Sequence, residues 1–145
     1  MSKIFRMTVD EAKKLIQQFE NGDLPKEKWT HEAHFVMALW YCSHQPLPLA
    51  IESIKEGIKN YNISVGGANT DDSGYHETIT VFYTRLIINY ILQGDLCQPF
   101  ENRLAALSQQ SFLLKDFPLR YYTKELLMSK DARKKWTPPD IQPLG

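Results

Sequence analysis

The chain has 145 residues, of which 43% are hydrophobic and 23% charged, and its 17 basic and 17 acidic residues leave no net charge. This length and composition indicate one globular helical domain over residues 1–145 and exclude a disordered or fibrous chain. A neutral chain lacks the positive charge with which proteins bind a phosphate backbone, so no nucleic-acid partner is expected.

A capping box predicts where the first helix begins. Thr8 supplies the hydroxyl, and Glu11 supplies the carboxylate three residues later. Apolar residues follow at helical spacing, and Gly22 gives a stop signal. The sequence therefore predicts a peripheral helix over about residues 9–20.

The segment 31–43 is predicted to be a central helix. Between residues 35 and 42 it is apolar on every face, and a helix at the surface does not tolerate that pattern. Pro46 and Pro48 end it and open a third helix with a single apolar stripe, which places that helix at the periphery.

A polar segment, 62–74, comes next and contains two adjacent glycines, two adjacent aspartates and no basic residue. It is predicted to be a long loop, and long ordered loops in compact domains are often functional. The following segment, 77–93, is apolar on most faces. Its β-branched residues would suit a strand, but the length of the apolar run favours a second central helix that Gly94 closes.

The last third of the chain is expected to form shorter helices within 99–111 and 123–136. A Pro-rich segment, 136–145, is predicted to be an extended tail because its adjacent prolines prevent a helix. The predicted fold class is therefore all-α, a compact bundle of about five to six helices around the two central helices 31–43 and 77–93.

Neither a membrane partner nor a secretory signal is expected. The first twenty residues contain acids and a helical pattern, and prolines break the longest charge-free stretch, 35–51. Cys42 and Cys97 are too few for a disulfide framework and suit a reducing compartment. We therefore expect a cytoplasmic protein.

Three of the four histidines lie at the starts of the two predicted central helices: His31 and His34 on the first, His76 on the second. Residues three apart on a helix lie about 60° apart around its axis, so both imidazoles of the first helix can reach one point. In an up-down-up-down bundle the second and fourth helices run parallel and share an N-terminal end. The three histidines are therefore expected to meet under the 62–74 loop.

Three neutral imidazoles can bind a divalent metal such as Zn, Fe or Mn and leave a position open for water or substrate. The sequence thus predicts a small metal-dependent enzyme that acts on a small molecule, with His31, His34 and His76 as ligands. Glu77 is the candidate catalytic base, and Thr80 and Tyr83 are the candidate cofactor-binding residues because they share the face of His76. The Gly-Gly pair of the loop lacks the residues of a phosphate-binding loop, so no nucleotide cofactor is expected.

Two metal-free functions stay open. The chain could be a ligand-binding or protein-interaction module whose histidines cap helices through backbone groups. Alternatively, His76 and Glu77 could work as a metal-free acid–base pair near neutral pH.

Overall fold

A computed structural model describes residues 7–144, and all regular elements of that range are helical. The α-helices are α1 (Val9–Asn21), α2 (His31–His44), α3 (Leu47–Ser64), α4 (Glu77–Gln93), α5 (Phe100–Leu107), α6 (Lys124–Leu127) and α7 (Lys130–Lys134); the 3₁₀ helices are η1 (Lys26–Lys28), η2 (Ser111–Leu113) and η3 (Phe117–Arg120). The predicted all-α bundle is confirmed. None of these helices is long and apolar enough to cross a membrane.

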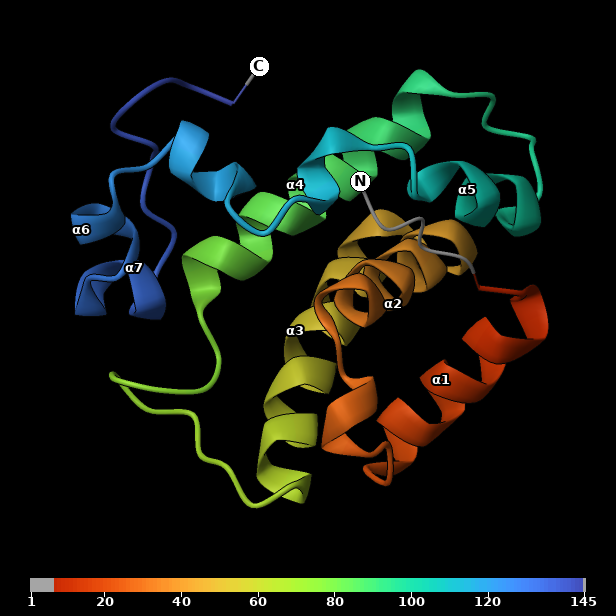
Figure 1. The fold of residues 1–145 in the computed structure, drawn as a ribbon, viewed down its shortest axis with the longest axis horizontal. Coiled ribbons are helices and arrows are strands. Elements are labelled where there is room, and N and C mark those ends of the chain that lie inside the picture. The colour runs from red at the N-terminus through yellow and green to blue at the C-terminus, as the bar shows by residue number, and fades with distance from the viewer. Residues whose placement is uncertain (1–6, 145) are drawn as a thin grey trace.

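Helices α1, α2 and α3 pack against one another, and α4 runs across one end of this group (Figure 1). Helix α5 lies near the C-terminal end of α4, while α6 and α7 lie beside its N-terminal end (Figure 1). Helix α2 contacts α1, α3, α4, α5 and η2. Its lack of a polar face is explained by these contacts, because a helix surrounded by other elements has no side that faces water.

The start of α1 forms as the sequence predicts. Thr8 Oγ1 accepts a hydrogen bond from the Glu11 backbone N–H, and Glu11 Oε1 accepts one from the Thr8 backbone N–H, each at 3.1 Å. Gly22 ends the helix with φ 76°, a left-handed conformation that glycine adopts without steric cost.

The segment between α3 and α4 starts later than predicted, because α3 continues to Ser64. The side chain of Asn69 anchors it: its amide donates to the Lys59 carbonyl at 3.0 Å. Arg133 of α7 donates to the Gly74 carbonyl at 2.8 Å, so this segment leads the chain from α3 to α7 before α4 begins.

The two aspartates of that segment pair with α7. Asp71 lies 3.1 Å from Lys134 Nζ, and Asp72 lies 3.5 Å from Lys130 Nζ. All four side chains are largely exposed, and exposed ion pairs contribute little to stability. The ion-pair partners of both aspartates are therefore on α7 and not on α2.

The residues predicted to form a helix within 123–136 form two short helices, because Ser129 caps α7 by accepting a hydrogen bond from the Ala132 backbone N–H. The tail that follows has no helix over 136–144. It is attached to the domain, since Thr78 Oγ1 donates to the Lys135 carbonyl at 2.9 Å and Tyr122 donates to the Thr137 carbonyl at 2.6 Å.

Helices α1 and α3 approach closely at Gly57. A Cβ atom there would lie 2.7 Å from Cε2 of Phe19, well inside van der Waals contact. The Phe19 ring stacks on Trp29, with 4.8 Å between centroids, and Trp29 stacks on the ring of His34 at 3.8 Å. The position of His34 therefore depends on the packing of α1 against α3.

We predict that Gly57→Ala lowers the free energy of unfolding by about 1–3 kcal/mol, the usual cost of an added methyl group in a packed interior. The loss should appear even though alanine in a helix is intrinsically favoured over glycine by about 1 kcal/mol. Urea unfolding of the wild type and the variant measures it.

The double variant Phe19→Leu/Gly57→Ala is the control. Removing the ring should make the added methyl group less costly than in the wild-type background, so the two changes should not be additive. A stabilising effect of Gly57→Ala alone would contradict the close approach of α1 and α3.

Candidate functional site

A pocket of about 220 Å³ lies between α2, α3 and α4. Aliphatic and aromatic side chains form most of its wall, including Phe35 of α2 and Ile54 and Ile58 of α3. Its polar groups come from the start of α2 and from α4. Since the described lining contains no aspartate, glutamate, lysine or arginine, the pocket is uncharged when its histidines are neutral.

His34 lines this pocket with one nitrogen already engaged. Its Nδ1 lies 2.7 Å from the backbone carbonyl of Thr30, one turn earlier in the chain. A carbonyl can only accept a hydrogen bond, so Nδ1 carries the proton and, in the neutral ring, Nε2 is an acceptor. Burial lowers the pKa of His34, with the Thr30 carbonyl opposing this, which favours the neutral ring near pH 7.

His31 lines the same pocket one turn before His34. Its ring meets Phe35 and Tyr83 edge to face, with centroids 5.0 and 5.8 Å apart. Its Nε2 is buried and has no hydrogen-bond partner in residues 7–144, an arrangement that is rare in native interiors. Burial lowers the pKa of His31, and the nearby Leu113 carbonyl partly offsets this.

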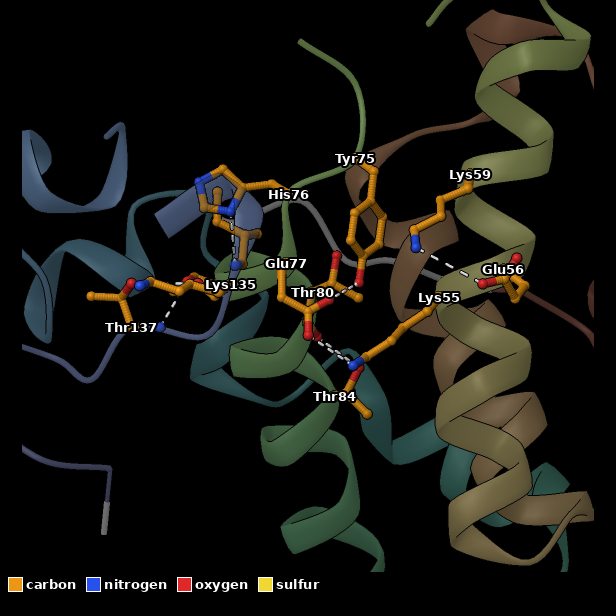
Figure 2. Close-up of polar contacts among 12 residues, drawn as sticks. Lys55, Glu56, Lys59, Tyr75, His76, Glu77, Thr80, Thr84, Lys135 and Thr137 are labelled. Atoms are coloured by element: carbon orange, nitrogen blue, oxygen red, sulfur yellow. Dashed lines mark hydrogen bonds and ion pairs between the residues drawn. The ribbon is translucent and has the colours of Figure 1, made fainter. Parts of the chain in front are cut away.

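His76 is absent from the described lining of the pocket, and both of its ring nitrogens are engaged elsewhere. Nδ1 accepts a hydrogen bond from the Ile79 backbone N–H at 3.1 Å and so caps α4, while Nε2 donates to the Leu127 carbonyl at 2.7 Å. Figure 2 shows its ring directed away from Glu77 and Lys55. No ring lone pair is left for a metal ion, because a neutral imidazole has one acceptor nitrogen.

The expected shared rim does not form, because a later part of α4, and not its start, lies beside the start of α2. Tyr83, and not His76, is the α4 residue that meets the His31 ring. Tyr83 lies seven residues after His76, and two helical turns advance about 10 Å. The segment between α3 and α4 contacts α7 before α4 begins.

Within residues 7–144, no group of three or more His, Cys, Asp and Glu side chains is placed to hold a metal ion. The structure brings two of the predicted ligands, His31 and His34, to one pocket and places His76 apart from them. The three-histidine metal centre therefore stays a prediction, and the residues that it names do not fit a shared ion in this geometry.

Glu77, the predicted catalytic base, links three elements. Its Oε2 lies 2.8 Å from Lys55 Nζ of α3, and its Oε1 accepts a hydrogen bond from the Tyr75 hydroxyl (Figure 2). Burial raises the pKa of Glu77, but the hydrogen bonds from Lys55 and Tyr75 and the charges of Lys55 and Lys59 together outweigh this and leave it below its ordinary value. A carboxylate with a lowered pKa and both oxygens engaged is a weak base.

Thr80 and Tyr83, the two predicted cofactor-binding residues, do line the pocket. Burial raises the pKa of Tyr83, so its hydroxyl keeps its proton at neutral pH. The hydroxyl of Thr84, another lining residue, donates to the Thr80 carbonyl at 2.7 Å, which leaves its oxygen as an acceptor.

Sequence reasoning missed the contribution of α3 to this site. Ile54 and Ile58 belong to the apolar stripe that indicated a peripheral helix, and the stripe itself was the signal that these residues face inward. The stripe gives no information about the space between its side chains and those of α4.

Comparison of the chain with protein-family models, with curated proteins and with solved structures gave no match. Functional reasoning about the pocket therefore starts from its geometry and chemistry.

We predict that His76→Ala lowers the free energy of unfolding by about 1–3 kcal/mol. The loss combines a helix cap, typically worth about 1 kcal/mol, with a buried hydrogen bond of similar value to the Leu127 carbonyl. His76→Asn should recover part of it, because an asparagine oxygen can still accept from the Ile79 N–H. Urea unfolding compares the variants; a neutral effect of His76→Ala would contradict the capping role.

Proposed function

We propose that this protein binds a small, largely apolar molecule in the pocket between α2, α3 and α4. The observation that carries the proposal is the composition of the pocket: aliphatic and aromatic walls, with two histidines at the start of α2 among the few polar groups. An apolar concavity with a few convergent polar groups is the usual form of a small-molecule site.

The volume limits the size of the ligand. An engineered apolar cavity of about 150 Å³ in another protein is large enough for benzene. A pocket of about 220 Å³ therefore suits a single ring with one or two small substituents, or an aliphatic chain of similar volume. Sites for drug-sized molecules are typically larger, from about 300 Å³.

The walls suit binding without a large rearrangement. They come from three helices of 14, 18 and 17 residues, and the helix that carries both histidines contacts neighbours on every side. A ligand that enters such a site loses water contact over its apolar surface, which is favourable by roughly 25 cal/mol per Å² before the cost of association.

The proposal requires no metal and no cofactor. A metal-dependent enzyme would need His76 beside His31 and His34, and an acid–base pair of His76 and Glu77 would need free atoms on both groups. The hydrogen bonds of His76 and Glu77 favour the ligand-binding function over both. We keep a cytoplasmic location in the proposal, which the exposed free thiol of Cys97 suits.

Filling the pocket tests the proposal. Ala38 lines it and is 6% exposed, so Ala38→Leu should occupy part of the volume. We expect the wild type to bind ethylbenzene, seen as saturable shifts of α2 and α4 amides in heteronuclear NMR, and the variant to bind at least roughly tenfold more weakly.

Ala106→Leu is the matched control, because it makes the same change at an exposed position of α5 and should leave ethylbenzene binding unchanged. Urea unfolding of both variants shows whether the fold is retained. Normal binding by a folded Ala38→Leu variant, or shifts outside the pocket, would rule out this site.

Zinc titration separates the proposal from the metal-dependent enzyme. A three-ligand site should stabilise the fold by about 2.7 kcal/mol at a hundredfold excess over Kd. Because both nitrogens of His76 are engaged, we expect no rise in Tm for protein without a histidine tag. A rise that His76→Ala removes and His44→Ala retains would establish the metal centre instead.

A further inference from the structure

We infer that the pocket selects neutral ligands that carry a hydroxyl group, and that Nε2 of His34 accepts the hydrogen bond from that hydroxyl. This inference rests on the proposed ligand-binding function and assigns the chemistry of the ligand. It follows from the state of the His34 ring, from the charge of the lining and from the space available.

The first observation is that the His34 ring is held in one tautomer and one orientation. Nδ1 donates to the Thr30 carbonyl at 2.7 Å, and the ring lies on Trp29 with 3.8 Å between centroids and 28° between planes. Held in this way, a neutral imidazole presents its acceptor, Nε2, in a fixed direction. An acceptor fixed in advance costs little entropy when a donor binds to it.

The second observation concerns access to that nitrogen. Within residues 7–144, Nε2 of His34 makes no hydrogen bond, and it is not among the side-chain nitrogens that are sealed from solvent without a partner. The Nε2 of His31, one turn away, is sealed in that way. Of the two pocket histidines, His34 is therefore the one whose Nε2 is open to solvent and unpartnered in that range.

The third observation is the absence of charge in the described lining, which holds no acidic, lysine or arginine side chain. A carboxylate ligand would place its negative charge against the His34 lone pair, and an ammonium ligand would be buried without a counter-ion. Both arrangements cost several kcal/mol of uncompensated desolvation in general. A neutral alcohol or phenol satisfies the acceptor and brings no charge.

Tyr83, which lines the pocket, can donate a hydrogen bond to the oxygen of such a ligand. Burial raises the pKa of Tyr83, so this lining residue keeps a phenolic proton that it can donate. A hydroxyl group both donates and accepts, unlike an ether or a hydrocarbon. Donor, acceptor and volume together favour a small phenol or a short-chain alcohol.

Three probes of similar size test this inference: 4-ethylphenol, 4-ethylanisole and ethylbenzene, with Kd values from NMR titration of the full chain. The anisole keeps the oxygen of the phenol and lacks the donor. We expect the wild type to bind 4-ethylphenol roughly tenfold more tightly than either of the others, the usual worth of one buried hydrogen bond.

His34→Phe should abolish this preference, because phenylalanine keeps an aromatic ring against Trp29 and has no acceptor. Its affinity for ethylbenzene, which forms no hydrogen bond, measures any change in the apolar part of the pocket, and the ratio of the two Kd values is the quantity compared. His44→Phe is a closely matched control: His44 Nδ1 lies 2.8 Å from the Trp40 carbonyl and its ring lies 4.0 Å from Trp40, but it is not among the described lining residues. That variant should keep the full preference for the phenol.

A second measurement does not depend on the folding of a variant. The ¹⁵N resonances of the wild-type His34 ring should show a protonated Nδ1 and an unprotonated Nε2, and 4-ethylphenol should shift the Nε2 resonance while 4-ethylanisole should not. Equal affinities for the three probes would overturn the inference and leave the proposed function intact. Absence of binding by all three would overturn both.

Discussion

The burial of α2 on every side is the constraint on which the rest of the structure depends. A helix that contacts four other α-helices cannot carry polar side chains in its middle, and eight of its fourteen residues are buried. Its histidines lie at its ends, where a backbone carbonyl accepts from Nδ1 of His34 and of His44. The hydroxyl of the buried Tyr41, near the end of the helix, donates to Glu20 of α1. The polar groups that α2 contributes to the pocket, His31 and His34, are therefore at its start. Burial lowers the pKa of both imidazoles, which favours their neutral form.

The pocket exists because α4 is fixed at its own start by a different set of contacts. His76 bonds the backbone of α4 with one nitrogen and the backbone of α6 with the other, and Glu77 bonds Lys55 of α3. These bonds place the start of α4 beside α6 and α7, so that residues one and two turns later, Thr80 and Tyr83, cross the start of α2. A polar residue at the start of a helix can thus determine a site without lying in it.

Much of the helical structure was predictable because its signals are local. The capping box at Thr8 and the apolar runs of α2 and α4 each depend on neighbouring residues, and all of them form as predicted. Whether His31, His34 and His76 lie together could not be predicted, because that depends on the path of the loop after α3. Asp71 and Asp72 indicated a functional loop, but their partners, Lys134 and Lys130, lie on α7, about sixty residues further along the chain. Long-range pairs between exposed charges leave no periodic pattern in a sequence.

His34 and His44 show why the local pattern alone cannot identify the site. Each donates from Nδ1 to the carbonyl four residues earlier, and each lies against a tryptophan. The tryptophan partner of His44 is on its own helix, and the Phe100 ring of α5 lies 5.3 Å from the His44 ring. The partner of His34, Trp29, precedes α2 and packs on Phe19 of α1. Gly57 of α3 permits that packing, so α1 and α3 support the ring of His34 through Phe19 and Trp29, while His44 remains exposed. The same side-chain chemistry becomes a preorganised acceptor only where tertiary packing both holds the ring and leaves space beside it.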